Sequence, residues 1–332
     1  MTRGLRRLPL RRGEKQRRLS QRDPRGFALL ATLWLSMMIA TLSLNFALEA
    51  RHDRLAVANF AESAQATAAA RAGVATALSR LDRLTTGTAP VGVMPVTTAD
   101  PWQYADTLIA ERMELGAGSG YDVHVRDVAA TLDVNLASQS DWQSFFIGLQ
   151  IDFDAADRLA QAIIDWRDVG DDPGANGAER DAYISSGRLV LPTNRNFGSI
   201  DELRDVMGMT PAIFKMASPY LSIGGNSNRV NVNTAPAAVL HTIPQFGDDI
   251  VNLILSARAS QVRIASMQQL TRLVGGVFSG ANAALTARLT FTTDQVQITS
   301  LGYAPGGRTT AVSVMTVTRA QPVARIVWRG DE

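Results

Sequence analysis

The stretch from Phe27 to Leu48 does not contain a single charged side chain. As a helix rising 1.5 Å per residue it is about 33 Å long, enough to cross a hydrocarbon core of roughly 30 Å. A secretory signal has an apolar region of only about 7–15 residues, followed at once by small residues for cleavage. Here the first such residues, Ala56-Val57-Ala58, come after a charged segment at 49–54. The run therefore predicts a retained membrane anchor.

Charge is unevenly divided around this run. Residues 1–25 carry ten basic and two acidic side chains, a net +8, whereas the remainder carries 23 basic and 29 acidic side chains, a net −6. A basic segment in front of an apolar helix holds that end of a chain in the cytoplasm, so the excess says nothing about nucleic acid. The chain has no cysteine, which excludes disulfides, thiolate metal sites and a cysteine nucleophile.

The helical pattern continues past the apolar run. Residues 49–83 contain no proline and one glycine, and half of the positions from Ala56 to Ala77 are alanine. Alanine is the strongest helix former, and its small side chain lets helices approach closely. Two interpretations stay open: an anchor followed by a coiled stalk, or one long helix through both segments that packs among similar helices.

A basic segment ending at Gly26, then Phe27 and an apolar helix that runs into an amphipathic one, resembles the start of type IV prepilins and pseudopilins. The resemblance implies that a prepilin peptidase cuts after Gly26 and methylates the new amino terminus at Phe27. Most members carry glutamate at the fifth mature position, where this chain has Ala31. A carboxylate buried in a fibre core needs a partner, so a subunit without it suits the end of a fibre. This departure and the length of 332 residues resemble the K component of the general (type II) secretion pathway.

The resemblance implies an α+β chain with a type IV pilin-like fold, in which a long helix packs on an antiparallel sheet. Alternating segments predict strands at 121–128, 131–134, 296–303, 309–318 and 323–328, and a short helix is possible near 105–113. The expected parts are a cleaved leader at 1–26, the helix at 27–84, the first strands at 85–134, an inserted all-α domain at 135–290 and the last strands at 291–332.

The expected insert contains a degenerate repeat, with copies at about 132–208 and 230–275. "LDVNLA" at 132–137 matches "VNVNTA" at 230–235, and "SIDELRDVMG" at 199–208 matches "SMQQLTRLVG" at 266–275. Ser199 with Glu202, and Ser266 with Gln269, are capping boxes that predict a helix start in each copy. Each copy resembles a helix-hairpin-helix or SAM-like unit. The first copy is the longer one, because it holds an acidic loop at 168–198 between its matched helices.

This loop gathers five acids between positions 168 and 181, among glycines and a proline that let the backbone fold tightly. The five are Asp168, Asp171, Asp172, Glu179 and Asp181. Such carboxylates repel one another unless they are solvated or bind a cation, and hard oxygen ligands suit Ca²⁺. A solvated acidic loop remains the alternative. The resemblance to K pseudopilins, through Asp168, Glu179, Asp181 and Tyr183, implies calcium, in a number that the loop leaves open because Gly170 stands where a second acid is usual.

The sequence disfavours catalysis and DNA binding. The three histidines, His52, His124 and His241, are far apart and in no nucleophile or metal spacing. A phosphate-binding hairpin would read Pro-Gly-φ-Gly, but residues 244–247 read Pro-Gln-Phe-Gly, and the net −6 beyond residue 25 repels a polyanion.

The resemblance therefore implies a minor pseudopilin that forms the tip of the type II secretion pseudopilus with the I and J minor pseudopilins, above the major pseudopilin fibre. It implies a single-pass protein of the bacterial inner membrane, with a cytoplasmic N-terminus and a periplasmic C-terminal domain. The alternative is a minor pilin or DNA-uptake component of a related fibre.

Overall fold

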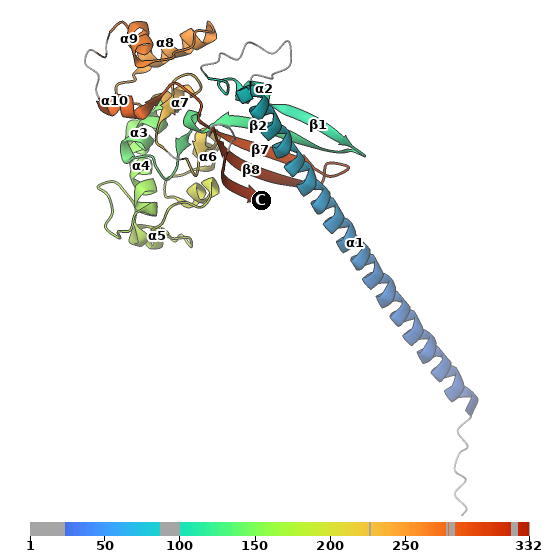
Figure 1. Cartoon of the computed structure of the whole chain (residues 1–332). Coiled ribbons are helices and arrows are strands. Elements are labelled where there is room, and N and C mark those ends of the chain that lie inside the picture. The colour runs from blue at the N-terminus through green and yellow to red at the C-terminus, as the bar shows by residue number, and fades with distance from the viewer. Residues whose placement is uncertain are drawn as a thin grey trace, which may run out of the picture. The chain divides into compact units, whose positions relative to one another are not determined.

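A single helix, α1 (Pro24–Thr86, 63 residues), forms the N-terminal part of the computed structural model. The structure describes residues 24–86, 100–225, 227–276, 278, 283–319 and 325–331 (Figure 1). The expected leader lies outside the described residues up to residue 23. The chain divides into two compact units, 1–60 and 61–332, and the division falls within α1. A long N-terminal helix is thus confirmed, as its alanine content and the lack of proline predict.

Five strands form one antiparallel sheet in the order β1-β2-β7-β8-β9 (Figure 1). Their bounds are β1 (Glu111–Gly116), β2 (Ser119–Asp127), β7 (Gln295–Tyr303), β8 (Thr310–Thr318) and β9 (Arg325–Asp331). The central strands β2 and β7 are adjacent in space although residues 128–294 separate them in the chain, with Asp127 opposite Val296. The expected antiparallel sheet is therefore present, and everything between β2 and β7 is inserted at one end of it.

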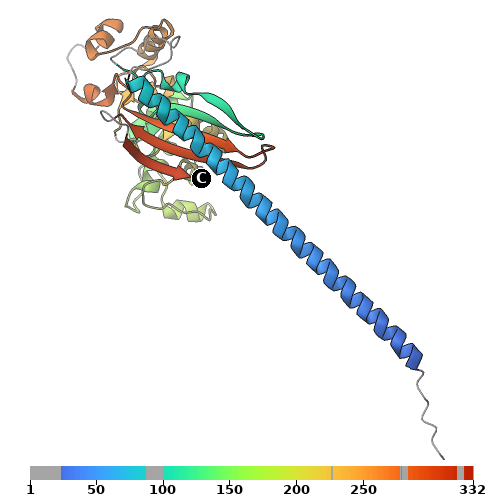
Figure 2. The same cartoon turned by 45° about the vertical axis from the view of Figure 1, so that its right-hand side comes forward.

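The last part of α1 packs on this sheet through small residues. A Cβ atom on Gly302 of β7 would overlap the backbone of α1 at Ala66 and Ala70, and one on Gly73 of α1 would overlap Ser300 of β7. These glycines bring the helix and strand close enough for Leu81 and Ile298 to share one buried core with other apolar side chains. In Figure 2 the C-terminal end of α1 crosses the strands of the sheet.

Two local predictions are wrong. The helix considered at 105–113 is only α2 (Ala105–Leu108), and the edge strand β1 begins at Glu111. The strand expected at 131–134 shrinks to β3 (Leu132–Asp133), which pairs with β4 (Leu221–Ser222) and not with the sheet. In both places short alternating or apolar segments fit helix and strand equally well, and tertiary pairing decided between them. The last expected strand, 323–328, is partly outside the described residues; β9 begins at Arg325.

The region between β2 and β7 consists mainly of short helices. Its helices are η1 (Val128–Ala130), α3 (Gln139–Gly148), α4 (Phe153–Arg167), α5 (Arg180–Ser185), η2 (Ile200–Asp205), α6 (Pro211–Ala217), η3 (Ser218–Tyr220), α7 (Ala237–Leu240), α8 (Asp248–Ala259), α9 (Met267–Leu273) and α10 (Ala283–Arg288). The insert has two halves, 132–222 and 230–290, and each is closed by a parallel pairing of two residues. β3 pairs with β4 in the first half, and β5 (Val230–Asn231) pairs with β6 (Leu289–Thr290) in the second. In each half the first and last residues are therefore neighbours.

The two halves repeat the same hydrogen bonds. Asn135 donates its side-chain amide to the carbonyl of Phe197 and accepts from its N–H. Asn233 makes the same two hydrogen bonds with Ile264. Each asparagine thereby satisfies both backbone groups of a buried residue, which a side-chain amide can do with its one acceptor and two donors. The longer first half encloses the acidic loop.

Helix ends also match between the halves. The Glu202 side chain accepts a hydrogen bond from the N–H of Gly198, and the Gln269 side chain accepts one from the N–H of Ala265. In each half, the side chain thus bonds to the residue just before the N-cap serine. The element after Ser199 is the 3-10 helix η2, however, whereas Ser266 begins the α-helix α9.

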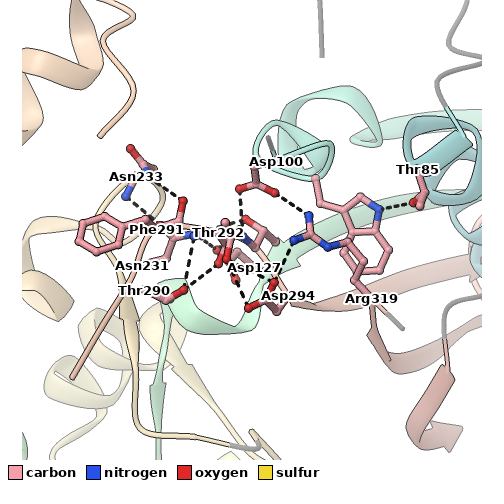
Figure 3. A network of polar contacts seen from close by, with 12 residues as sticks. Thr85, Asp100, Asp127, Asn231, Asn233, Thr290, Phe291, Thr292, Asp294 and Arg319 are labelled. Atoms are coloured by element: carbon pink, nitrogen blue, oxygen red, sulfur yellow. Dashed lines mark hydrogen bonds and ion pairs between the residues drawn. The ribbon is translucent and has the colours of Figure 1, made fainter. Parts of the chain in front are cut away.

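A buried polar network joins the sheet to the insert (Figure 3). The carboxylate of Asp127, the last residue of β2, accepts from Asn231 Nδ2 (2.7 Å), Thr234 Oγ1 (2.7 Å), Thr293 Oγ1 (3.0 Å) and the N–H of Ala129 (2.9 Å). Ala129 lies where the chain leaves the sheet, Asn231 and Thr234 lie at the start of the second half of the insert, and Thr293 lies where the chain returns to the sheet. One carboxylate thus ties three distant segments together.

A second carboxylate extends this network toward α1. Asp100 accepts from the N–H of Thr293 (3.0 Å) and pairs with Arg319 (2.9 Å), which also pairs with Asp294 (3.0 Å). The Arg319 guanidinium lies over the ring of Trp102, whose indole N–H donates to Thr85 Oγ1 (3.0 Å) (Figure 3). The end of α1, the return strand and the insert are therefore held in one hydrogen-bonded cluster.

Burial raises the pKa of Asp127 to about 6, while its four hydrogen bonds act in the opposite direction. The folded chain then binds a proton more tightly at this group than the unfolded chain does, so its contribution to stability falls as pH rises from about 4 to about 6. A shift of about two pKa units corresponds to about 3 kcal/mol. We expect Asp127→Asn to remove this part of the pH dependence in thermal unfolding of the full chain in detergent.

The matched control is Glu114→Gln, an exposed acid on the neighbouring strand β1, which should leave the difference due to Asp127 as it is in the unmodified chain. Parallel pH profiles of the unmodified chain and Asp127→Asn would contradict this account of Asp127.

Candidate functional site

The part of α1 from Phe27 to Leu48 is an exposed apolar surface, and exposed apolar side chains continue among charged ones as far as Phe60. Phe27, Trp34 and Phe60 are 78%, 71% and 77% exposed. The helix from Phe27 onward is long and apolar enough to cross a membrane. Its hydroxyl groups bond within the helix, as Ser36 does to the carbonyl of Thr32 (2.8 Å), which suits a surrounding without water. This surface is a candidate for contact with lipid or other apolar helices.

The acidic loop lies between α4 and α5. Its first residue, Asp168, caps the C-terminus of α4, and Glu179 is the N-cap of α5. Asn194 holds the loop from the other side, because its side-chain amide donates to the carbonyl of Gly170 (2.9 Å) and to Asp171 Oδ1 (3.1 Å). Both ends of the loop and its middle are therefore fixed by ordered neighbours.

An aromatic layer supports the loop. Trp166 stacks on Phe197 with ring centroids 6.3 Å apart and lies 5.6 Å from Tyr183. The Tyr183 hydroxyl accepts the N–H of Met207 (2.7 Å), and the Arg188 guanidinium lies over its ring. All three rings are buried. The structural role expected for Tyr183 thus has a definite form, which anchors α5 beneath the acids.

Glu179 is a buried carboxylate whose two oxygens have no hydrogen-bond partner among the described residues. The residue is only 4% exposed. Burial, together with the nearby charges of Asp165, Asp168 and Asp171, raises its pKa to about 7. A carboxylate placed in this way is costly unless a cation or a proton neutralises it.

Asp165 is a member of this cluster that is not among the five predicted ligands. It lies on α4, is 4% exposed, and accepts from the N–H of Gly174 (3.2 Å). Burial raises its pKa. A Cβ atom on Gly177 would overlap its carboxylate, so the loop folds directly over it. The signal that could have found it is its position in "DWRD", one helical turn before Asp168.

The five predicted metal ligands have different surroundings. Asp168 and Asp171 help to raise the pKa of Glu179, whereas Asp172 and Asp181, which are exposed as Asp171 is, do not contribute to that shift. Within the described ranges, no three acidic or histidine side chains are close enough to hold a metal ion as they stand. The orphaned oxygens of Glu179 near Asp165 and Asp168 nevertheless suit a hard cation, because carboxylate oxygens are the ligands that Ca²⁺ takes.

Comparison with known proteins gives consistent matches. Residues 125–225 match the family described as type II secretion system (T2SS), protein K. The chain is 34% identical over 112 residues to the type II secretion system protein K of Dickeya chrysanthemi, and 30% identical over 104 residues to that of Pseudomonas aeruginosa. These matches cover 32% and 31% of this chain, and 30% and 31% of the relatives, so less than a third of each relative's length is spanned.

The fold has a solved counterpart. A chain in the crystal structure of the GspK-GspI-GspJ complex from the enterotoxigenic Escherichia coli type 2 secretion system matches with a TM-score of 0.59 at 16% identity, over 86% of this chain and 99% of that one. The likeness extends well beyond residues 125–225 and includes most of the described architecture. Residues 125–225 are thus similar to the type II secretion system protein K family, and the fold of the chain is similar to that of the solved chain.

Proposed function

We propose that this protein is a minor pseudopilin at the tip of the type II secretion pseudopilus, with a structural and not a catalytic role. The observation that carries the proposal is α1 itself, because one helix is exposed up to Phe60, is apolar from Phe27 to Leu48, and then packs on an antiparallel sheet. This is the arrangement of a type IV pilin-like subunit, with the helical region between β2 and β7 as a SAM-like insert.

Assembly follows from the surfaces of α1. Before assembly, its apolar half lies in the inner membrane with the basic segment on the cytoplasmic side, and residues beyond it are periplasmic. In a fibre, other apolar helices replace the lipid. Ala31 presents no carboxylate to pair with a neighbour's amino terminus, and the broad insert covers the end of the fibre. Both features suit a subunit that caps the major pseudopilin fibre.

The partners we propose are the I and J minor pseudopilins, because the matching solved chain comes from a complex of such proteins. Exposed alanines on the outer side of α1, such as Ala64, Ala68 and Ala75, would let partner helices pack closely. We expect the full chain, co-expressed with the I and J proteins of its own system, to purify with both. Ala68→Arg should reduce the bound I and J proteins at least about tenfold, since a long charged side chain separates the helices.

Ala212→Arg is the matched control, because Ala212 is an exposed helical alanine of the insert, away from α1. It should leave the complex intact. If the unmodified chain purifies without the I and J proteins, the tip assignment is wrong.

We also propose that prepilin peptidase cuts between Gly26 and Phe27 and methylates Phe27. Both residues lie in the first turns of α1. Intact-mass measurement of the protein from cells with the peptidase should give a chain that begins at a methylated Phe27. Gly26→Leu should keep residues 1–26 attached. A first residue downstream of Leu48 would mean that the anchor is lost, and no fibre could contain this chain.

Calcium is the cofactor that we propose for the acidic loop. Asp165, Asp168 and Glu179 would hold it, with Asp171 beside them and the exposed Asp172 and Asp181 as further candidates. The ion would neutralise buried charge and fix the loop between α4 and α5. It would supply structural stability and no chemistry of its own.

The test is thermal unfolding of the full chain with calcium and with a chelator at pH 8. At a calcium concentration about 100 times the dissociation constant, binding stabilises the fold by about 2.7 kcal/mol. Glu179→Gln should lose most of this gain and should equal or exceed the unmodified chain in chelator, because it removes an unpaired buried charge. Asp201→Asn, an exposed acid outside the loop, is the control. Equal melting temperatures with calcium and chelator would rule out the ion.

A further inference from the structure

A polar groove of about 370 Å³ lies between α2 and the C-terminal end of α8. Tyr104, Asp106 and Thr107 line one wall, and Asn233, Arg258 and Gln261 line the other. Both walls belong to the same compact unit of the chain. The proposed pseudopilin role assigns nothing to this groove.

Arg258 is the distinctive residue of the groove. Its guanidinium donates to the backbone carbonyls of Ala235 and Thr234, which fixes its position. It is half-buried, and burial lowers its pKa. Among the described residues no acidic side chain forms an ion pair with it; the nearest electrostatic influence is Asp106, on the opposite wall. A fixed cation is therefore exposed to the groove without a counter-ion in contact.

The first half of the insert contains an equivalent arginine, whose surroundings can be compared with those of Arg258. Arg167 occupies the equivalent place at the end of α4 and donates to the carbonyls of Val134 and Ala137. Three acids act on Arg167 and favour its charged form. They are Asp133, Asp141 and Asp168.

All three acids are absent from the second half. In the alignment of "LDVNLA" with "VNVNTA" and of the two helix ends, their places are taken by Asn231, Val239 and Ala259. Ala259 lines the groove. The second half has thus kept the arginine and a pair of carbonyl bonds, one of them to the equivalent alanine, Ala235 for Ala137. It lacks the three acids that act on Arg167, so that only Asp106 acts on Arg258, and the groove adjoins this arginine.

The chemistry of the groove indicates which ligand would replace them. A guanidinium has five N–H donors, and the two carbonyls take two of them, which leaves three for an acceptor. Carboxylates match this planar donor set best, through paired hydrogen bonds. The neighbouring groups are amides and hydroxyls, which can donate to the same anion. The volume admits a side chain but not a folded segment.

We propose that the groove between α2 and α8 binds the carboxylate of an acidic side chain, a glutamate or aspartate of a partner protein, with Arg258 as its cation. The incoming carboxylate supplies near Arg258 the negative charge that Asp133, Asp141 and Asp168 supply near Arg167. The site goes beyond the proposed pseudopilin role, because that role could be correct with the groove empty.

Saturation-transfer NMR on the full chain in non-ionic detergent tests the proposal with three small probes. N-acetylglutamate α-amide carries one side-chain carboxylate, and N-acetylglutaminamide is its neutral isostere. N-acetylalanine carries a chain-terminal carboxylate instead. We expect transfer to the first probe and none to the second. Transfer to N-acetylalanine alone would overturn the side-chain assignment, because the groove would then take a chain terminus.

The variants that test the site keep Arg258, because its hydrogen bonds to backbone carbonyls also hold the fold together. Gln261→Glu puts a carboxylate inside the groove, and the positive φ of residue 261 (61°) suits both side chains equally. It should weaken probe binding at least about tenfold. Ser260→Glu, the adjacent residue outside the groove lining, should not. Asp106→Asn removes the opposing acid and should strengthen binding about threefold.

Circular dichroism melts of each variant check that the fold is unchanged. Equal transfer to the acidic and neutral probes, or equal effects of Gln261→Glu and Ser260→Glu, would overturn the carboxylate site. None of these results depends on the I and J proteins or on calcium, so the outcome is separate from that of the tip assignment.

Discussion

The carboxylate of Asp127 is the interaction on which the arrangement of the chain depends. Strands β2 and β7 are neighbours in the sheet, yet the whole helical insert separates them in sequence. Such an insertion is stable only if the points where the chain leaves and re-enters the sheet stay together. Asp127 holds the exit, and its oxygens accept from Asn231 at the start of the second half and from Thr293 at the return. Because a buried carboxylate without donors is costly, these hydrogen bonds also specify the register of the segments that provide them.

The two halves of the insert share a backbone arrangement and differ in the charged groups near their equivalent arginines. Each half closes with a short parallel pairing. In each half an asparagine satisfies backbone groups at the same place, and an arginine bonds to two carbonyls, one of them equivalent between the halves. Around Arg167 the first half keeps acids and adds a loop in which Glu179 is buried without a donor. Around Arg258 the second half keeps no acid in contact and leaves a groove. The excess charge is therefore negative at one site and positive at the other, which suits a cation in the first and a carboxylate in the second.

The helix and the sheet contribute the assembly properties. Glycines at 73 and 302 allow α1 to lie close to β7, so that small alanines are buried at this close approach and larger side chains such as Leu81 are buried further along the helix. The residues before 61 keep their apolar side chains exposed, which is stable in water only if lipid or other helices cover them. The same helix thus joins a folded unit to a surface that requires partners.

The sequence alone predicted the membrane-spanning length of the apolar run, the basic segment in front of it, strands near the C-terminus and the internal repeat, because each depends on periodicity or composition over many residues. It also identified the acidic loop as a charged cluster. It could not determine that Asp127 and Thr293 meet, that Asp165 lies beneath the loop while Asp172 and Asp181 are exposed, or that Arg258 lies without an acid in contact. These facts depend on contacts between segments that are far apart in the chain. Burial and the direction of a side chain follow from such packing, and no local pattern encodes them.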